Sequence, residues 1–218
     1  MVWKTDKRGQ LTNIGKFVGH ASEISSISIG PNNRWVVSSG RKRAKIWDLE
    51  TLKEAHSIET ESEVACRILP NAKAAIVGGR TGTKIFMIPE MTEWKNFDQA
   101  NIRSSQATAV SLDGTRLAVS SGYKATLFNT QNGSQLTELN AGETIWSLAF
   151  HPDGKHLLAG GKGKVMIWDI ETGTKVSELD VPSSYVQCLA ISNDSKRIAA
   201  IPGSAGQKLT VFNTPTLD

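Results

Sequence analysis

The chain has 218 residues, of which 39% are hydrophobic and 21% charged, and it carries a formal net charge of +4 at pH 7. This composition indicates a globular chain long enough to bury a core and excludes a low-complexity or fibrous chain. No stretch approaches the roughly 18 consecutive apolar residues of a membrane helix, and the N-terminal segment MVWKTDKRGQ lacks an apolar signal region. We therefore expect no membrane span and a cytoplasmic location, with the nucleus as the alternative.

Residues 1–19 predict two short strands joined by a hairpin turn at residues 6–9, whose sequence is DKRG. This segment has the pattern of the third and fourth strands of a larger unit, with Trp3 at the end of the earlier one. It is therefore interpreted as a partial unit that precedes a series of complete ones.

The complete unit is clearest in residues 143–169, where three apolar runs are separated by two turns. Pro152 presets the backbone at the first turn, and Gly154 permits the chain to leave it. The same pattern recurs without gaps 40 residues earlier, where it ends at Phe128, and 121 residues earlier, where it ends at Trp47. The pattern therefore marks an internal repeat of strands and turns.

Two looser copies complete the series, and the Asn or Asp of the first turn recurs about every 40 residues, at positions 32, 71, 113, 153 and 194. A fourth strand-like segment follows each closing strand, except in the last copy. A period near 40 with four strands per unit is typical of a β-propeller blade. We therefore predict one all-β domain over residues 1–218, a β-propeller of about five four-stranded antiparallel blades at 20–58, 59–100, 101–140, 141–181 and 182–218.

The chain resembles the WD40 family, although its repeats are degenerate. Gly19-His20 is followed at the family's spacing by Trp47-Asp48, and Trp168-Asp169 closes a second unit. The resemblance implies a structural hydrogen-bonded network within a blade. In the first blade, this network would use His20, either Ser38 or Ser39, and Trp47. The Asp position of the network holds Arg41 there and Lys162 in the fourth unit, so no unit keeps the complete set.

The first and last units are incomplete, which leaves two architectures open. In one, the ends close on each other to give a five-blade monomer. In the other, the ring is open or part of a larger one, and its exposed terminal blades associate with another chain. The second architecture is favoured, and it predicts self-association through the terminal blades.

Basic residues concentrate in the turns between the second and third strands. We call these turn residues the basic rim: Arg41, Lys42, Arg43, Arg80, Lys124 and Lys162. The basic rim and Trp94, which lies in an edge segment, form the candidate interaction surface. One interpretation is a site for an acidic or phosphate-bearing ligand, such as nucleic acid or a phosphoinositide. The other, which is favoured, is a set of ordinary solvated turns, because aromatic residues for base stacking are not interleaved there.

Acidic residues lie instead between the units, at Glu23, Glu59, Glu61, Glu63 and Glu143. Carboxylates in a ring could hold a hard cation, and a metal-dependent hydrolase is one alternative for the chain. No sequence motif of a nucleophile, zinc protease or phosphate loop accompanies them. We therefore predict no enzyme activity, no metal and no cofactor.

Four further side chains are predicted to lie in the core. Trp35 and Trp146 fall on alternating strand positions, and Cys66 and Cys188 lie inside apolar runs as free thiols.

The resemblance implies a non-catalytic scaffold that binds proteins or peptides. Its expected role is that of a subunit or platform in an assembly, and nucleic acid is not the favoured partner.

Overall fold

The computed structural model describes residues 1–60, 65–70, 73–79, 82–88, 92–96, 105–182, 184–203 and 208–217. In these ranges the chain forms strands, turns and bends, and every resolved strand pairing is antiparallel. The predicted all-β fold class is thereby confirmed. Within the same ranges, no helix is long and apolar enough to cross a membrane.

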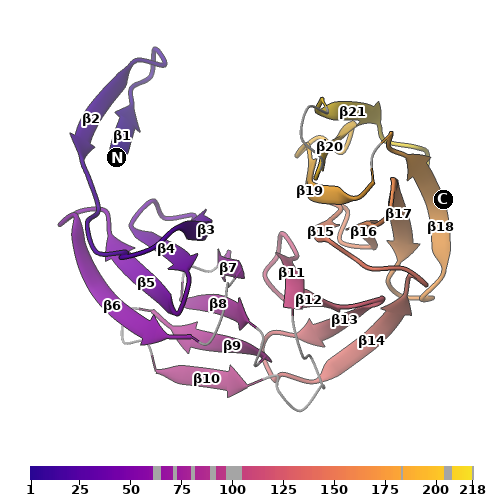
Figure 1. Ribbon diagram of the computed structural model, residues 1–218, viewed down its shortest axis with the longest axis horizontal. Helices are drawn as coiled ribbons and strands as arrows, with labels where there is room; N and C mark the ends of the chain where they lie inside the picture. The colour runs from indigo at the N-terminus through magenta and orange to yellow at the C-terminus, as the bar shows by residue number, and fades with distance from the viewer. Residues whose placement is uncertain are drawn as a thin grey trace. The chain divides into compact units, whose positions relative to one another are not determined.

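The strands follow one another as meanders, in which each strand pairs with its neighbour in the sequence (Figure 1). A two-stranded sheet contains β1 (Val2–Thr5) and β2 (Leu11–Gly15). The next three sheets each have four strands. The first contains β3 (Ile24–Ile29), β4 (Trp35–Gly40), β5 (Arg43–Asp48) and β6 (Lys53–Glu59), and the second contains β7 (Ala65–Ile68), β8 (Ala74–Gly79), β9 (Gly82–Met87) and β10 (Glu93–Asn96). The third contains β11 (Ser105–Val110), β12 (Arg116–Ser121), β13 (Lys124–Asn129) and β14 (Gln135–Asn140).

Two further sheets end the chain. One has four strands, β15 (Ser147–Phe150), β16 (His156–Gly160), β17 (Lys164–Asp169) and β18 (Lys175–Asp180). The other has three, β19 (Val186–Ile191), β20 (Arg197–Pro202) and β21 (Thr210–Asn213). The repeated meander is the element from which β-propeller blades are built.

The chain divides into two compact units, one of Met1–Val77 with Ile85–Trp94 and one of Gly78–Lys84 with Lys95–Asp218. The core of the first unit lies between neighbouring sheets, because apolar side chains of β4 and β5 pack against those of β7 and β8. Its members are Trp35, Val37, Ile46, Cys66, Ile68, Ala75 and Ile88. The predictions that Trp35 and Cys66 are buried are confirmed.

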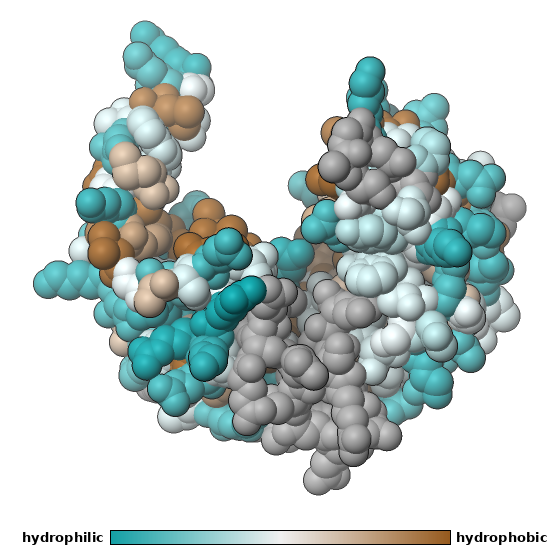
Figure 2. All heavy atoms as spheres, in the orientation of Figure 1, coloured by the Kyte–Doolittle hydropathy of each residue, from teal (hydrophilic) through white to brown (hydrophobic). Residues whose placement is uncertain are grey.

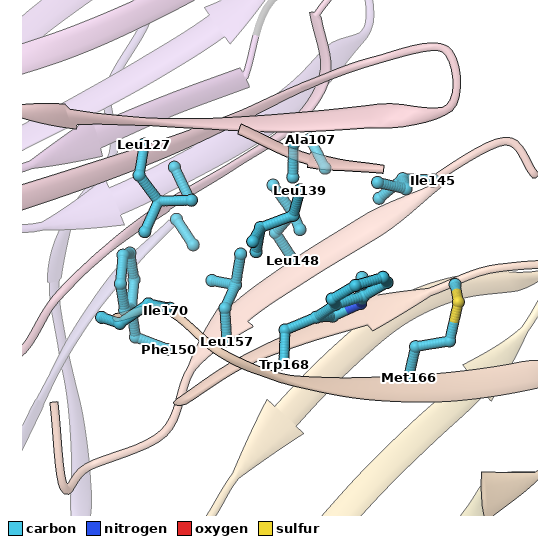
Figure 3. Packing of buried hydrophobic residues seen from close by; sticks show 14 residues of the cluster. Ala107, Leu127, Leu139, Ile145, Leu148, Phe150, Leu157, Met166, Trp168 and Ile170 are labelled. Atoms are coloured by element: carbon cyan, nitrogen blue, oxygen red, sulfur yellow. The ribbon is translucent and has the colours of Figure 1, made fainter. Parts of the chain in front are cut away.

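The core of the second unit follows the same plan. Leu127 and Leu139 of one sheet face Leu148, Leu157 and Trp168 of the next (Figure 3). On the opposite side of the second sheet, a further cluster buries Leu158, Val165 and Ile167 against Val186, Ile198 and Ala200 of the last sheet. A single blade buries both of its faces only when it has a neighbour on each side.

Serine side chains reinforce two of these three contacts between sheets. The backbone N–H of Cys66 donates to Ser26 Oγ at 3.3 Å, and the N–H of Ile68 donates to Ser28 Oγ at 3.1 Å. In the second unit, the Ser147 hydroxyl donates to the carbonyl of Val186 at 2.9 Å. Ser26 and Ser147 stand 121 residues apart, at the same position of the repeat.

The turn between the first and second strands requires a left-handed backbone at its fourth residue. Gly114 and Gly154 have φ values of 73° and 71° there, while Asn33 and Ser195 adopt φ values of 53° and 61°. Left-handed φ is strain-free for glycine and unfavourable for residues with a Cβ atom. The recurring Gly of the sequence pattern therefore has a backbone cause.

Two predicted core side chains are exposed instead. Trp146 precedes β15, is 38% exposed, and lies against Tyr185, with ring centroids 4.9 Å apart and the ring planes tilted by 41°. Cys188 lies on the last sheet and is exposed, and both cysteines are free. The predictions of burial were wrong for these two side chains, because alternation within a strand does not reveal whether a neighbouring sheet covers that face.

Candidate functional site

The residues that the family resemblance singled out meet within the sheet of β3–β6. The imidazole Nε2 of His20 lies 2.7 Å from Ser38 Oγ, and the indole N–H of Trp47 donates to the same oxygen at 2.7 Å. The hydroxyl of Ser38, on β4, thus joins the segment before β3 to Trp47 on β5. Of the two serines considered, Ser38 takes this role.

The surroundings of Trp47 are closely packed. Phe17 stacks on the indole with ring centroids 4.9 Å apart. A Cβ atom on Gly19 would lie 3.0 Å from the Trp47 ring and 2.8 Å from the Glu54 carboxylate, so glycine permits this close approach. The buried Lys45 ammonium lies 5.7 Å from the centroid of the Trp47 ring and pairs with Glu54.

The charge state of His20 follows from these neighbours. Burial, followed by the positive charge of Lys45, lowers the pKa of His20, and the nearby carboxylate of Glu54 opposes this only in part. A neutral imidazole suits a structural hydrogen bond to Ser38.

Asp48 and Asp169, which follow the two repeat tryptophans, cap the next turn. Asp48 Oδ1 accepts the backbone N–H of Glu50 at 2.7 Å. Asp169 Oδ1 likewise accepts the N–H of Thr172 at 2.7 Å. In the sheet of β15–β18, Ala159 stands at the position that Ser38 occupies in the sheet of β3–β6. Trp168 therefore packs in the apolar core without a serine hydroxyl as its partner.

The structure places several residues of the basic rim in cross-strand ion pairs. Arg43 of β5 lies 3.1 Å from Glu59 of β6, and Lys124 of β13 lies 2.6 Å from Glu138 of β14. Lys164 of β17, which follows the rim residue Lys162 in the sequence, pairs in the same way with Glu178. Each rim cation on a third strand thus faces a carboxylate on the fourth, which reduces the net positive field of the turn.

Three further rim residues lie at the surface of the described chain. Arg41, Lys42 and Lys162 are exposed, and Lys42 adopts a left-handed φ of 65°. Arg80 and the side chain of Trp94 lie outside the described residues, as do Glu61 and Glu63. The acidic-ligand interpretation of the rim therefore stays a prediction.

A stronger candidate for an interaction site is the free face of the first four-stranded sheet. Ile24, Ile27 and Ile29 of β3 are 56%, 58% and 59% exposed. Their counterparts 121 residues later, Ile145, Leu148 and Phe150, are only 1%, 6% and 8% exposed because the preceding sheet covers them. Figure 2 shows hydrophobic atoms gathered at the surface over β3. We call Ile24, Ile27 and Ile29 the leading face.

The last sheet exposes the face that, in the sheet before it, is covered by the following sheet. Val211 pairs with Ala199 across β20 and β21, as Ile167 pairs with Leu158 across β16 and β17. Ile167 is fully buried against the following sheet, whereas Val211 is 54% exposed and Leu209 is 57% exposed. We call Leu209 and Val211 the trailing face. Both faces carry the side chains of an inter-blade seam without the second half of that seam.

The sequence interpretation missed one cluster, formed by His151, Asp153 and His156 in the turn before β16. The turn was considered for its Pro and Gly and for the recurrence of its Asp, but not for its two histidines. A signal was nevertheless present, because the hairpin register that the turn imposes brings the residues at its two ends side by side, so that a His at each end meets the turn Asp.

Comparison with known proteins agrees with the repeat pattern. The family model described as WD domain, G-beta repeat, matches residues 11–48 and 133–169. A ribosome biogenesis protein BOP1 homolog from Drosophila grimshawi is 38% identical over 72 residues, which are 32% of this chain and 9% of that protein. An intraflagellar transport protein 122 homolog from Xenopus tropicalis is 32% identical over 72 residues, 33% of this chain and 6% of that protein.

A third relative aligns over more of the chain. The WD repeat-containing protein 3 homolog from Dictyostelium discoideum is 23% identical over 155 residues, or 70% of this chain. The chain spans 12% of that protein's length. All three relatives are therefore much longer than the segment they share with this chain.

Proposed function

The chain carries WD40 repeats, and we propose that it acts as a non-catalytic protein-interaction scaffold that assembles through the leading and trailing faces. Two of the relatives described above are named for ribosome biogenesis and for intraflagellar transport. Those names describe the longer proteins. For this chain, they support only the general role of an interaction module.

The observation that carries the proposal is the exposure of five aliphatic side chains whose repeat counterparts are buried. Each member of the two faces is more than half exposed. Complete burial of one such side chain stabilises a structure by about 1.5 to 3 kcal/mol. Soluble proteins seldom leave contiguous apolar patches uncovered unless these form an interface.

The favoured occupant is a second copy of the same chain. In the second unit, a surface of the trailing kind, with Leu127 and Leu139, packs on one of the leading kind, with Leu148 and Phe150. The trailing face of one molecule therefore has the chemistry to pack on the leading face of another. Such a contact is head to tail, and it produces a ring or a filament according to its rotation.

The edge of the last sheet supports the same assembly. The sheet ends at β21 with three strands in the described part of the chain, whereas its predecessor has four. An edge strand presents unpaired backbone groups and readily adds a strand from another molecule. Backbone pairing would thus accompany the apolar contact.

The experiment compares charge substitutions on and off these faces by sedimentation velocity. Ile27→Asp and Val211→Asp should each shift the chain toward the monomer, because a carboxylate would be buried in the contact. Leu136→Asp is the matched control, since Leu136 is also an exposed aliphatic side chain but lies on β14. Equal association of all three variants and the unmodified chain would contradict the proposal.

A further inference from the structure

The turn between β15 and β16 brings two buried histidines and one carboxylate together. The backbone N–H of His151 donates to the carbonyl of His156 at 2.9 Å, which places the two residues opposite each other at the hairpin end. Between them, Asp153 Oδ2 lies 2.8 Å from His151 Nδ1 and 2.7 Å from His156 Nδ1. One ligand atom from each of the three side chains lies within 4.8 Å of the others.

The carboxylate is held in place by the turn backbone. Asp153 Oδ1 accepts the N–H of Lys155 at 2.7 Å and that of His156 at 3.2 Å. This leaves Oδ2 directed at the two imidazoles.

The hydrogen-bonding positions of the two imidazoles are only partly filled among the described residues. The backbone N–H of Asp153 points at His151 Nδ1 at 3.3 Å and requires a lone pair there, whereas the contact with Oδ2 requires a proton on the same nitrogen. The Nε2 atoms of His151 and His156 are both buried and have no hydrogen-bond partner among the described residues. A buried polar atom without a partner costs about 1 to 3 kcal/mol.

We propose that His151, Asp153 and His156 form a site for a divalent transition-metal ion of the zinc class. Two imidazoles and one carboxylate are a ligand set that zinc accepts, and three protein ligands leave one position of a tetrahedron for water or another donor. A cation between Oδ2 and the two Nδ1 atoms would take the place of the protons that join these atoms in the metal-free cluster. The two histidines are buried, whereas Asp153 is exposed and provides the route of entry.

The types of ligand atom indicate which metal ions the site would bind. Imidazole nitrogen favours zinc, copper and nickel over calcium and magnesium, which prefer oxygen ligands. Ligands around tetrahedral zinc lie roughly 3.3 Å apart, from bond lengths of about 2.0 to 2.1 Å. The carboxylate therefore has to withdraw by about half an ångström, a movement open to the exposed side chain of Asp153.

The test measures zinc binding to the untagged chain by isothermal titration calorimetry, with cobalt(II) absorption as the spectroscopic readout. We expect one zinc ion per chain and the visible bands of tetrahedral cobalt. Asp153→Asn preserves the shape of the turn and should weaken zinc binding at least about tenfold, as should His156→Gln. His56→Gln is the control, because His56 is exposed on β6, away from the cluster.

The zinc-binding results test the metal site whether or not the chain associates with a second copy. Loss of binding in Asp153→Asn with retention in His56→Gln supports the site, provided that tryptophan fluorescence shows both variants to be folded. If Asp153→Asn or His156→Gln does not fold, the cobalt spectrum of the unmodified chain decides the matter. Absence of tetrahedral bands, or zinc binding that Asp153→Asn leaves unchanged, would overturn the proposal.

Discussion

The indole N–H of Trp47 donates to the hydroxyl of Ser38 at 2.7 Å, and the His20 imidazole lies 2.7 Å from the same oxygen. One serine thus connects β4, β5 and the segment that enters β3. Two side-chain contacts of the first complete blade thus share one buried hydroxyl oxygen.

Replacement of Ser38 by Ala should destabilise the first unit by about 1 to 3 kcal/mol, because the buried indole N–H would lose its acceptor. Urea unfolding followed by tryptophan fluorescence measures the change. Ser57→Ala, at an exposed position of β6, is the control. Equal stability of the two variants would show that the network contributes nothing.

The left-handed position of the first turn predicts a pair of opposite effects. Gly154→Ala should destabilise the chain by about 1 kcal/mol, because φ is 71° there while the added Cβ atom meets no other atom within 4 Å. Ser195→Gly, at the same turn position with φ of 61°, should be neutral or stabilising. Thermal unfolding of both variants separates backbone strain from packing, and equal destabilisation by both would argue against strain.

Asp113 predicts a pH dependence of stability. Burial raises its pKa, but hydrogen bonds from Ser111 and Thr115 outweigh this and lower the pKa below its ordinary value. The stabilisation is therefore complete above about pH 4 and is lost as the pH falls through the lowered pKa. The stability difference between the chain and Asp113→Asn should be constant near neutral pH and shrink in acid. A difference that stays constant into acid would contradict the assignment.

The two thiols should react differently. Burial raises the pKa of Cys66, whose Sγ lies 3.6 Å from the carbonyl of Val37, whereas Cys188 is exposed. In dilute native protein, iodoacetamide should modify Cys188 and leave Cys66 intact until the chain unfolds. Mass spectrometry of Cys188→Ser supplies the control, since that variant should take up no label while folded.

Local features of the sequence were sufficient to predict the fold class. The Pro, Asp and Gly of the turn at 152–154 and the apolar runs on either side act within one hairpin, so their pattern predicts strands without knowledge of the rest of the chain. The approach of His20 and Trp47 to a serine of β4 was also foreseeable from the family resemblance, which left Ser38 and Ser39 open as alternatives.

Features that depend on neighbouring elements were not predictable. Trp146 alternates with core residues, yet its ring lies at the surface against Tyr185, 39 residues later. The sequence did not indicate ion-pair partners for the basic turn residues. In the structure, Arg43 and Lys124 each form an ion pair with a glutamate on the adjacent strand. In both cases the deciding contact is with a residue outside the local pattern.

The most direct test of the scaffold proposal is the absolute mass of the chain in solution, measured by light scattering after size exclusion over a concentration series. The exposed leading and trailing faces predict a mass that rises above 23.6 kDa with concentration, in discrete multiples of the chain. A mass of 23.6 kDa at every concentration would contradict association with a second copy.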